Sequence, residues 1–325
     1  MQSARSGNHR ACGTLALTLA LCLLGFGATL AGDPTTEIAA GGLTYAGQQT
    51  LITRQEAIAI ASDRIRVTYT LQNAGPETRT ALMAFALPDI DLLALDGATI
   101  DNPAYDAKNP MNFVGFAALV DEQPAEIYVY IRALSLGLVD ISRVLRELAL
   151  PFYPLHPDIG ARLAALPEVA KADLLARSAI RITDGQYEPL WTLKTTLFWQ
   201  QQFAAGQTRK IAISYSPIAG GSVATRDLVA NLQPRFCLSA EVAADLSRRG
   251  GADAARLKWT HYLASAGANA RGSVADYRVA IETAPKQAAY TCRAGLVSSA
   301  AAGSRDTREA DVIPEDDVQV LFVDP

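Results

Sequence analysis

Hydrophobic and polar side chains alternate along many segments of this 325-residue chain. In residues 65–72, Ile65, Val67, Tyr69 and Leu71 are separated by single polar residues. Successive side chains of a β-strand point to opposite faces, so this period of two predicts strands with one packed face and one wet face. A fold of antiparallel sheets follows. The same pattern recurs in residues 191–199, 211–215, 257–263, 277–281 and 318–323.

Turn residues between these segments predict hairpins. Residues 73–76 (Asn-Ala-Gly-Pro) lie between the first strand and residues 78–87, and we predict that the two segments pair. Residues 121–124 (Asp-Glu-Gln-Pro) separate residues 116–120 from 127–134, which predicts a second hairpin.

Two further segments read as irregular. Gly220-Gly221-Ser222 lacks the lysine and the spacing of a phosphate-binding loop, so we predict a turn there. Residues 298–311 are predicted to form a loose loop before the last strand.

The centre of the chain has helical periodicity instead. Asp140 is placed to cap a helix in which Ile141, Val144, Leu145 and Leu148 share one face. A second helical stretch covers residues 159–178, and a short helix is predicted at 240–248. We therefore predict a mainly β fold of the α+β class, with an antiparallel β-sandwich-like core and a helical insertion around residues 140–178.

The N-terminus has the features of an export signal. Positive residues are followed by an uncharged apolar run at residues 14–30 and by small residues around Ala31. This order predicts a signal peptide at residues 1–31 and a single exported β-rich domain at 32–325. A retained N-terminal anchor is the alternative. After cleavage we expect no membrane span and a periplasmic or secreted location.

Two cysteines remain after that cleavage. Cys237 and Cys292 are predicted to form a disulfide, because an exported chain meets an oxidising compartment. Two unpaired buried thiols are the alternative. Neither cysteine has a nearby cysteine or histidine at metal-ligand spacing, so no metal site is predicted there.

Composition and charge exclude several classes of protein. Half of the residues are hydrophobic and 19% are charged, which is typical of a globular chain and excludes bulk disorder. The net charge of −4 supplies no positive field for nucleic acid, so no nucleic-acid partner is predicted.

The sequence shows no catalytic motif. His156 reads as a solvated loop residue and His261 as a packed, hydrogen-bonded one, and no nucleophile motif is present. Asp89, Asp91 and Asp96 resemble a calcium loop, but the apolar Leu93 occupies a ligand position. We therefore predict no catalytic residue, no cofactor and no metal. Residues 315–317 (Glu-Asp-Asp) are predicted to form a solvated turn.

The tryptophans are the remaining candidates for ligand contact. Trp191, Trp199 and Trp259 share strand faces with aliphatic residues, which favours core packing over stacking on a carbohydrate.

Several blocks of the chain occur in a fixed order: residues 36–43, 65–73, 84–90, 203–206, 215–217, 220–223 and 267–269, with Trp199, Cys237 and Cys292. With these blocks the chain resembles the exported bacterial proteins of domain of unknown function 4424. Ala86 and Ala205 depart from the family pattern, which commonly has proline at these positions. A fainter similarity to the vault/inter-alpha-trypsin domain suggests a β-sandwich used in surface interactions.

The resemblance implies an exported β-rich unit and brings no known activity. We therefore predict a non-enzymatic binding or structural module of the cell envelope, whose partner is an envelope protein or a glycan. The alternative is an envelope hydrolase or carbohydrate-active enzyme whose carboxylates converge only in the folded chain.

Overall fold

The computed structural model describes residues 42–45, 50–87, 89–92, 99–101, 105–106, 109–249, 254–264, 272–296, 303–314 and 316–325. Three sheets and a two-stranded ribbon account for most of its regular structure. The predicted signal peptide lies outside the described residues. No helix in the described ranges is long and apolar enough to cross a bilayer.

Sheet A is antiparallel throughout, whereas sheet B contains one parallel pair, β16 with β2. Sheet A has the order β1 (Gly42–Tyr45), β4 (Arg79–Ala86), β12 (Thr192–Phe203), β8 (Tyr128–Ser135), β9 (Val139–Asp140). Sheet B has the order β18 (Gly303–Val312), β16 (Val274–Thr283), β2 (Leu51–Ile60), β3 (Ile65–Asn73), β13 (Thr208–Tyr215), β6 (Ala117–Val120), β7 (Gln123–Pro124).

Sheet C is antiparallel, and a separate ribbon pairs β10 with β11. Sheet C has the order β17 (Ala288–Tyr290), β19 (Val318–Asp324), β15 (Arg256–Tyr262), β14 (Ala219–Val223), β5 (Thr99–Asp101). The ribbon strands are β10 (Ile180–Thr183) and β11 (Gln186–Pro189).

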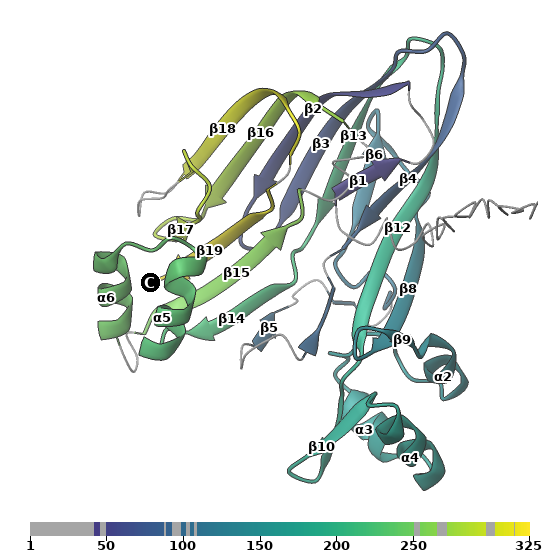
Figure 1. Ribbon diagram of the computed structural model, residues 1–325, viewed down its shortest axis with the longest axis vertical. Coiled ribbons are helices and arrows are strands. Elements are labelled where there is room, and N and C mark those ends of the chain that lie inside the picture. The colour runs from purple at the N-terminus through teal and green to yellow at the C-terminus, as the bar shows by residue number, and fades with distance from the viewer. Residues whose placement is uncertain are drawn as a thin grey trace, which may run out of the picture.

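The main core lies between the sheets. Val67 and Ile213 of sheet B, Leu197 and Trp199 of sheet A, and Phe322 of sheet C belong to one buried cluster. Sheet B therefore covers the inner faces of both other sheets, with β18 at its outer edge (Figure 1). This arrangement confirms the predicted mainly β, sandwich-like core.

Three short helices confirm the predicted insertion. They pack with the β10–β11 ribbon in a small core of their own, at the lower end of sheet A in Figure 1. Asp140 belongs to β9, and its Oδ1 accepts a hydrogen bond from the amide of Ser142 at 2.8 Å, while Ile141 stands at the cap position. The helices are α2 (Ser142–Glu147), α3 (Ile159–Ala164) and α4 (Glu168–Ala176).

Two more helices, α5 (Arg226–Arg235) and α6 (Ala240–Arg248), cover the outer face of sheet C. The prediction for α6 is confirmed. Helix α5 was not predicted, although Thr225 caps it by accepting a hydrogen bond from the amide of Leu228 at 3.3 Å.

Both predicted hairpins are wrong. Strand β3 pairs with β2 and β13, whereas β4 pairs with β1 and β12 in the other sheet. Likewise β6 pairs with β7 and β13, whereas β8 pairs with β12 and β9. After residues 73–76 the chain crosses the sandwich to the facing sheet, and it does the same between β7 and β8. The chain does reverse at Asp121 and Glu122, which both adopt positive φ, and this turn returns it to the short β7.

Two segments predicted to be irregular are strands. Gly220 and Gly221 lie within β14, where Gly220 is the partner of Trp259 and leaves room for its indole. The loop predicted at residues 298–311 is mostly β18, an edge strand whose residues are nearly all exposed. A strand that is exposed to water on both faces has no alternation of apolar and polar side chains, so the sequence did not predict β18.

Candidate functional site

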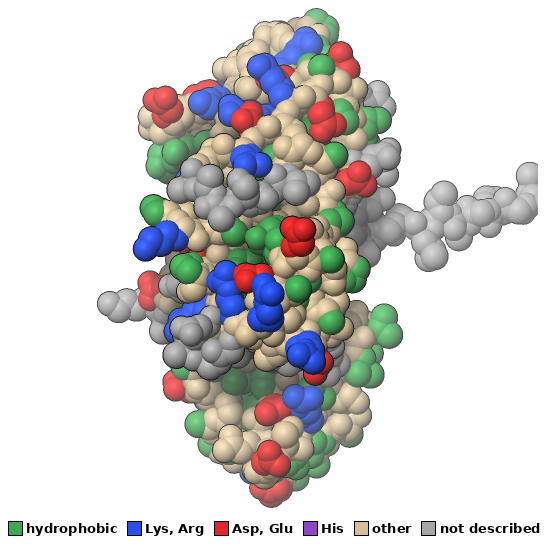
Figure 2. Space-filling model, turned by 90° about the vertical axis from the view of Figure 1, so that its left-hand side faces the viewer, with side chains coloured by type: hydrophobic (Ala, Val, Ile, Leu, Met, Phe, Trp, Pro, Cys, Tyr) green, Lys and Arg blue, Asp and Glu red, His purple; other side chains and the backbone are tan. Residues whose placement is uncertain are grey.

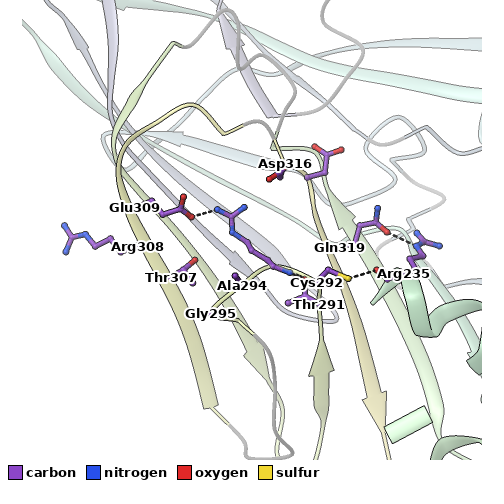
Figure 3. A pocket seen from close by; sticks show the side chains of 12 residues that line it. Arg235, Thr291, Cys292, Ala294, Gly295, Thr307, Arg308, Glu309, Asp316 and Gln319 are labelled. Atoms are coloured by element: carbon purple, nitrogen blue, oxygen red, sulfur yellow. Dashed lines mark hydrogen bonds and ion pairs between the residues drawn. The ribbon is translucent and has the colours of Figure 1, made fainter. Parts of the chain in front are cut away.

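A cavity of about 880 Å³ lies beside the disulfide, and we call it the disulfide pocket (Figure 3). Its walls come from the end of α5, the segment after β17, strand β18 and the start of β19. The lining residues are Arg235, Thr291, Cys292, Arg293, Ala294, Gly295, Thr307, Arg308, Glu309, Asp316, Asp317 and Gln319.

The predicted Cys237–Cys292 disulfide is confirmed. It joins residues 55 positions apart and ties the end of α5 to the segment that follows β17. Both cysteines are exposed. Arg235 lies two residues before one cysteine and Arg293 directly follows the other, so the bridge brings these two arginines to the same pocket.

Two of the three pocket arginines have carboxylate partners. Arg293 forms an ion pair with Glu309, and its guanidinium lies 5.4 Å from the centre of the Tyr277 ring. Arg308 donates two hydrogen bonds to Asp276, at 2.6 and 2.9 Å. Their charges are therefore neutralised within the protein.

Arg235 differs from the other two. Its Nε donates a hydrogen bond to the neutral Oε1 of Gln319 at 2.7 Å, and its guanidinium lies 5.2 Å from the centre of the Phe236 ring. Among the described residues it pairs with no carboxylate. Partial burial lowers the pKa of Arg235, although an arginine stays charged at neutral pH. Arg235 nevertheless remains exposed, so its guanidinium is a cation with hydrogen-bond donors to spare.

Two acidic residues also line the pocket. Asp317 Oδ2 is 3.1 Å from Nε2 of His261, which confirms that His261 is hydrogen-bonded. Asp316 lines the pocket beside it. The sequence predicted only a solvated turn here, and Glu315 lies outside the described residues.

The other predicted candidates do not converge on this pocket. Asp89 forms an ion pair with Lys194, and Asp96 lies outside the described residues. No group of three or more potential metal-binding side chains occurs in the described part of the chain. His156 is partly buried, with its ring 5.8 Å from that of Tyr105.

The tryptophans pack as predicted. Trp191 and Trp199 are at most 1% exposed, and Trp259 is partly buried against the cluster between sheet C and its helices.

Three carboxyl groups have a lowered pKa, and in each of them a hydrogen bond from an arginine is the main cause. A general acid needs a raised pKa, so these groups do not suggest acid catalysis. The pairs are Asp173 with Arg177, Glu188 with Arg181, and Asp276 with Arg308.

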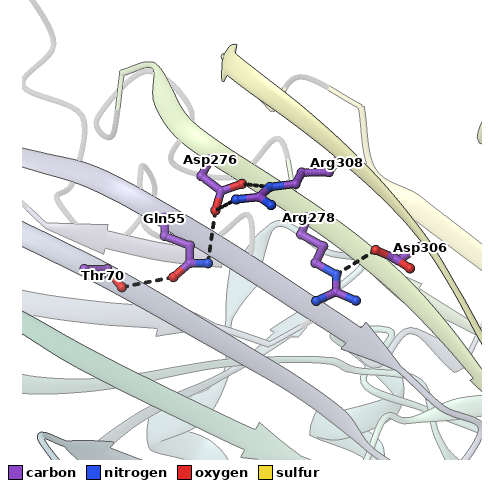
Figure 4. Close-up of polar contacts among 6 residues, drawn as sticks. All are labelled: Gln55, Thr70, Asp276, Arg278, Asp306 and Arg308. Atoms are coloured by element: carbon purple, nitrogen blue, oxygen red, sulfur yellow. Dashed lines mark hydrogen bonds and ion pairs between the residues drawn. The ribbon is translucent and has the colours of Figure 1, made fainter.

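The outer face of sheet B is a network of paired charges (Figure 4). Arg308 of β18 binds Asp276 of β16, which accepts a hydrogen bond from Gln55 of β2 at 3.1 Å. Arg278 pairs in the same way with Asp306. Figure 2 shows basic and acidic side chains interspersed on the side of the molecule that faces left in Figure 1. Charges on an edge strand also discourage the pairing of another chain along it.

Comparison with known proteins places the chain in a family. The model of domain of unknown function 4424 matches residues 31–321. The chain belongs to this family. DUF4424 thus covers nearly all of the predicted exported domain, as the resemblance implied. No curated protein matches the chain.

Solved structures show only distant likeness to this DUF4424 protein. A Legionella pneumophila structure described as a candidate nutrient binding protein has a TM-score of 0.45 at 13% identity, over 87% of this chain and 70% of that one. An M1 zinc metallopeptidase from Deinococcus radiodurans has a TM-score of 0.29 at 10% identity, over 85% of this chain and 43% of its own. Neither likeness carries an argument about function.

Sequence reasoning missed Arg235 and its pocket. The only available signal was that a basic residue stands next to, or two residues from, each predicted disulfide cysteine. A disulfide brings such neighbours together, so the pair could have been singled out.

Proposed function

We propose that this DUF4424 protein is an exported, non-enzymatic binding module that holds a carboxylate-bearing ligand in the disulfide pocket. The observation that carries the proposal is Arg235, an exposed guanidinium in the pocket lining with only a neutral amide as its polar partner among the described residues. No carboxylate among the described residues pairs with this positive charge, so it is open to an opposite charge from a ligand.

A ligand carboxylate supplies that opposite charge. Arginine presents several donors in a plane, so a carboxylate can accept two hydrogen bonds from it at once. The two other arginines of the pocket already bind Glu309 and Asp276, which leaves Arg235 as the group that selects the ligand. The cavity of about 880 Å³ falls within the size range of ordinary ligand pockets.

Asp316 and Asp317 favour a ligand of mixed charge. They bring negative charge to the pocket lining, so the pocket as a whole is not strongly positive. A small molecule that bears both a carboxylate and a donor group can pair with both signs of charge in the lining. Short peptides with a free C-terminus have this chemistry.

Export is part of the proposal. Two observations support it: residues 1–31 have the pattern of a signal peptide, and an exposed disulfide persists in an oxidising compartment. N-terminal sequencing of the protein recovered from the envelope should begin near Gly32.

The test of ligand class is calorimetric titration with short peptides in two forms, one with a free C-terminal carboxylate and one amidated. We expect binding of the free acids only, and a loss of about tenfold or more in affinity in Arg235→Gln. Arg278→Gln is the matched control, because Arg278 forms an exposed ion pair on the outer face of sheet B. Equal binding of acid and amide, or unchanged binding by Arg235→Gln, contradicts the proposal.

A further inference from the structure

A second cavity, of about 690 Å³, lies where sheet A meets the β6–β7 hairpin, and we call it the aromatic groove. Strand β8 begins at Tyr128, opposite Phe198 of β12. Beyond that point β12 continues to Phe203 paired with β4 alone among the described strands. Because β8 does not extend along this part of β12, the sheet has an open space there, and the β6–β7 hairpin lines its other side.

One wall of the groove is an aromatic pair, of which Tyr128 is exposed and Phe198 is partly buried. The rings of Tyr128 and Phe198 stack with their centres 5.6 Å apart and their planes 25° apart. Tyr128 is 51% exposed, and Leu82 beside them is 40% exposed. Large rings in a cavity wall that remain open to solvent are placed to contact a ligand, in contrast to the buried Trp191.

Hydrogen-bonding groups without a strong net charge form the other walls. The side chains of Gln123, Gln200 and Gln201 line the groove and supply both donors and acceptors. The side-chain Nε2 of Gln201 donates one hydrogen bond to the backbone carbonyl of Gln202, at 3.0 Å.

The charges in the groove are held by neighbouring groups. Arg209, its only described cationic side chain, donates to Asp121 at 2.6 Å and to the carbonyl of Gln202 at 2.9 Å. Glu126 accepts a hydrogen bond from the hydroxyl of Tyr128 at 2.8 Å. Two carboxylates against one cation that is already paired disfavour an acidic ligand.

The hairpin wall is rigidly placed. Asp121 lies in the tight turn with positive φ, and its second carboxylate oxygen accepts a hydrogen bond from the amide of Lys210 at 2.9 Å. The turn is thereby fixed to β13, and the width of the groove does not depend on a loose loop.

We propose that the aromatic groove binds a neutral sugar ring of an oligosaccharide. The C–H groups on a face of a sugar carry partial positive charge and pack against the negative face of an aromatic ring, while its hydroxyls pair with amides and carboxylates. A neutral sugar matches a groove that offers stacking rings, amides and no uncommitted cation. This proposal is independent of the disulfide pocket.

The test is titration of the full-length exported protein with maltohexaose, cellohexaose and N-acetylchitohexaose, and with an acidic hexagalacturonate for comparison. Trp199 lines the groove, so its fluorescence serves as a second readout beside calorimetry. We expect at least one neutral sugar to bind, with the acidic sugar bound at least several-fold more weakly.

Variants separate stacking from general damage. Tyr128→Ala should weaken the binding of the neutral sugar by about tenfold, which corresponds to ~1.4 kcal/mol, and Tyr128→Phe should retain most of it because the ring remains. Tyr130→Ala is the matched control, since Tyr130 is 40% exposed on the same strand and does not line the groove.

Three results overturn the proposal. They are no binding of any neutral sugar by folded protein, equal losses in Tyr128→Ala and Tyr130→Ala, and preferential binding of the acidic sugar. Sedimentation of the same samples identifies the rival occupant: a dimer that dissociates in Tyr128→Ala means that a second copy of the chain fills the groove.

Discussion

Gly220 offers a direct test of how sheet C is packed. A Cβ atom at this position would lie 2.3 Å from both Cε2 and Nε1 of Trp259, a distance that real side chains do not tolerate. Gly220 does not adopt positive φ, so its backbone conformation is open to alanine. The cost of Gly220→Ala therefore arises from the indole alone.

The magnitude follows from two opposing effects. Overpacking of this kind costs roughly 1–3 kcal/mol, whereas replacing glycine by alanine in a strand contributes about 0.5–1 kcal/mol through the entropy of the unfolded chain. We expect Gly220→Ala to destabilise the parent by about 1–2 kcal/mol. In a Trp259→Ala background the same change should become neutral or stabilising.

The assay is urea unfolding followed by circular dichroism for the parent, both single variants and the double variant. The double-mutant cycle should give a coupling of about 2 kcal/mol between the two positions. Gly160→Ala is the control, because its Cβ would meet nothing closer than the carbonyl oxygen of Tyr187, at 3.6 Å. Equal destabilisation by Gly220→Ala in both backgrounds would refute the reasoning, since it would place the cost in the backbone.

Two further predictions concern the disulfide and the charged face. Replacing Cys237 and Cys292 by serine should lower the free energy of unfolding by up to ~4 kcal/mol, the value for closing a loop of 55 residues. Because the bridge is exposed, reduction should lower the Tm of the parent protein to that of the variant. A Tm that does not respond to reductant contradicts this. The hydrogen bonds from Arg308 lower the pKa of Asp276, so their stabilisation is present above the ordinary carboxyl pKa and is lost as pH falls through the lowered one. The difference in urea midpoint between parent and Arg308→Gln should therefore shrink as the pH is lowered from 7 to below ~4, and a constant difference across that range counts against the pair.

The sequence did not predict the two proposed ligand sites. Arg235 and Gln319 are far apart in the chain, and only the packing of α5 against sheet C brings them within hydrogen-bond distance. Tyr128 and Phe198 were both within predicted strands, but their stacking depends on the β8–β12 register. Solvent exposure of those rings depends in turn on where β8 begins.

The sequence by itself determined the strands that alternate apolar and polar side chains, such as β3, β12 and β13, because this alternation is a local property of the backbone. It also determined the helical insertion, helix α6 and the two cysteines that pair. Only the tertiary structure decided the partner of each strand. Strands β3 and β4 are joined by a tight reversal, yet each buries its apolar face against the other sheet, and no local signal separates this outcome from a hairpin. Strand β18 was invisible for the opposite reason: its pairing with β16 uses backbone hydrogen bonds, which leave no mark on side chains exposed on both faces.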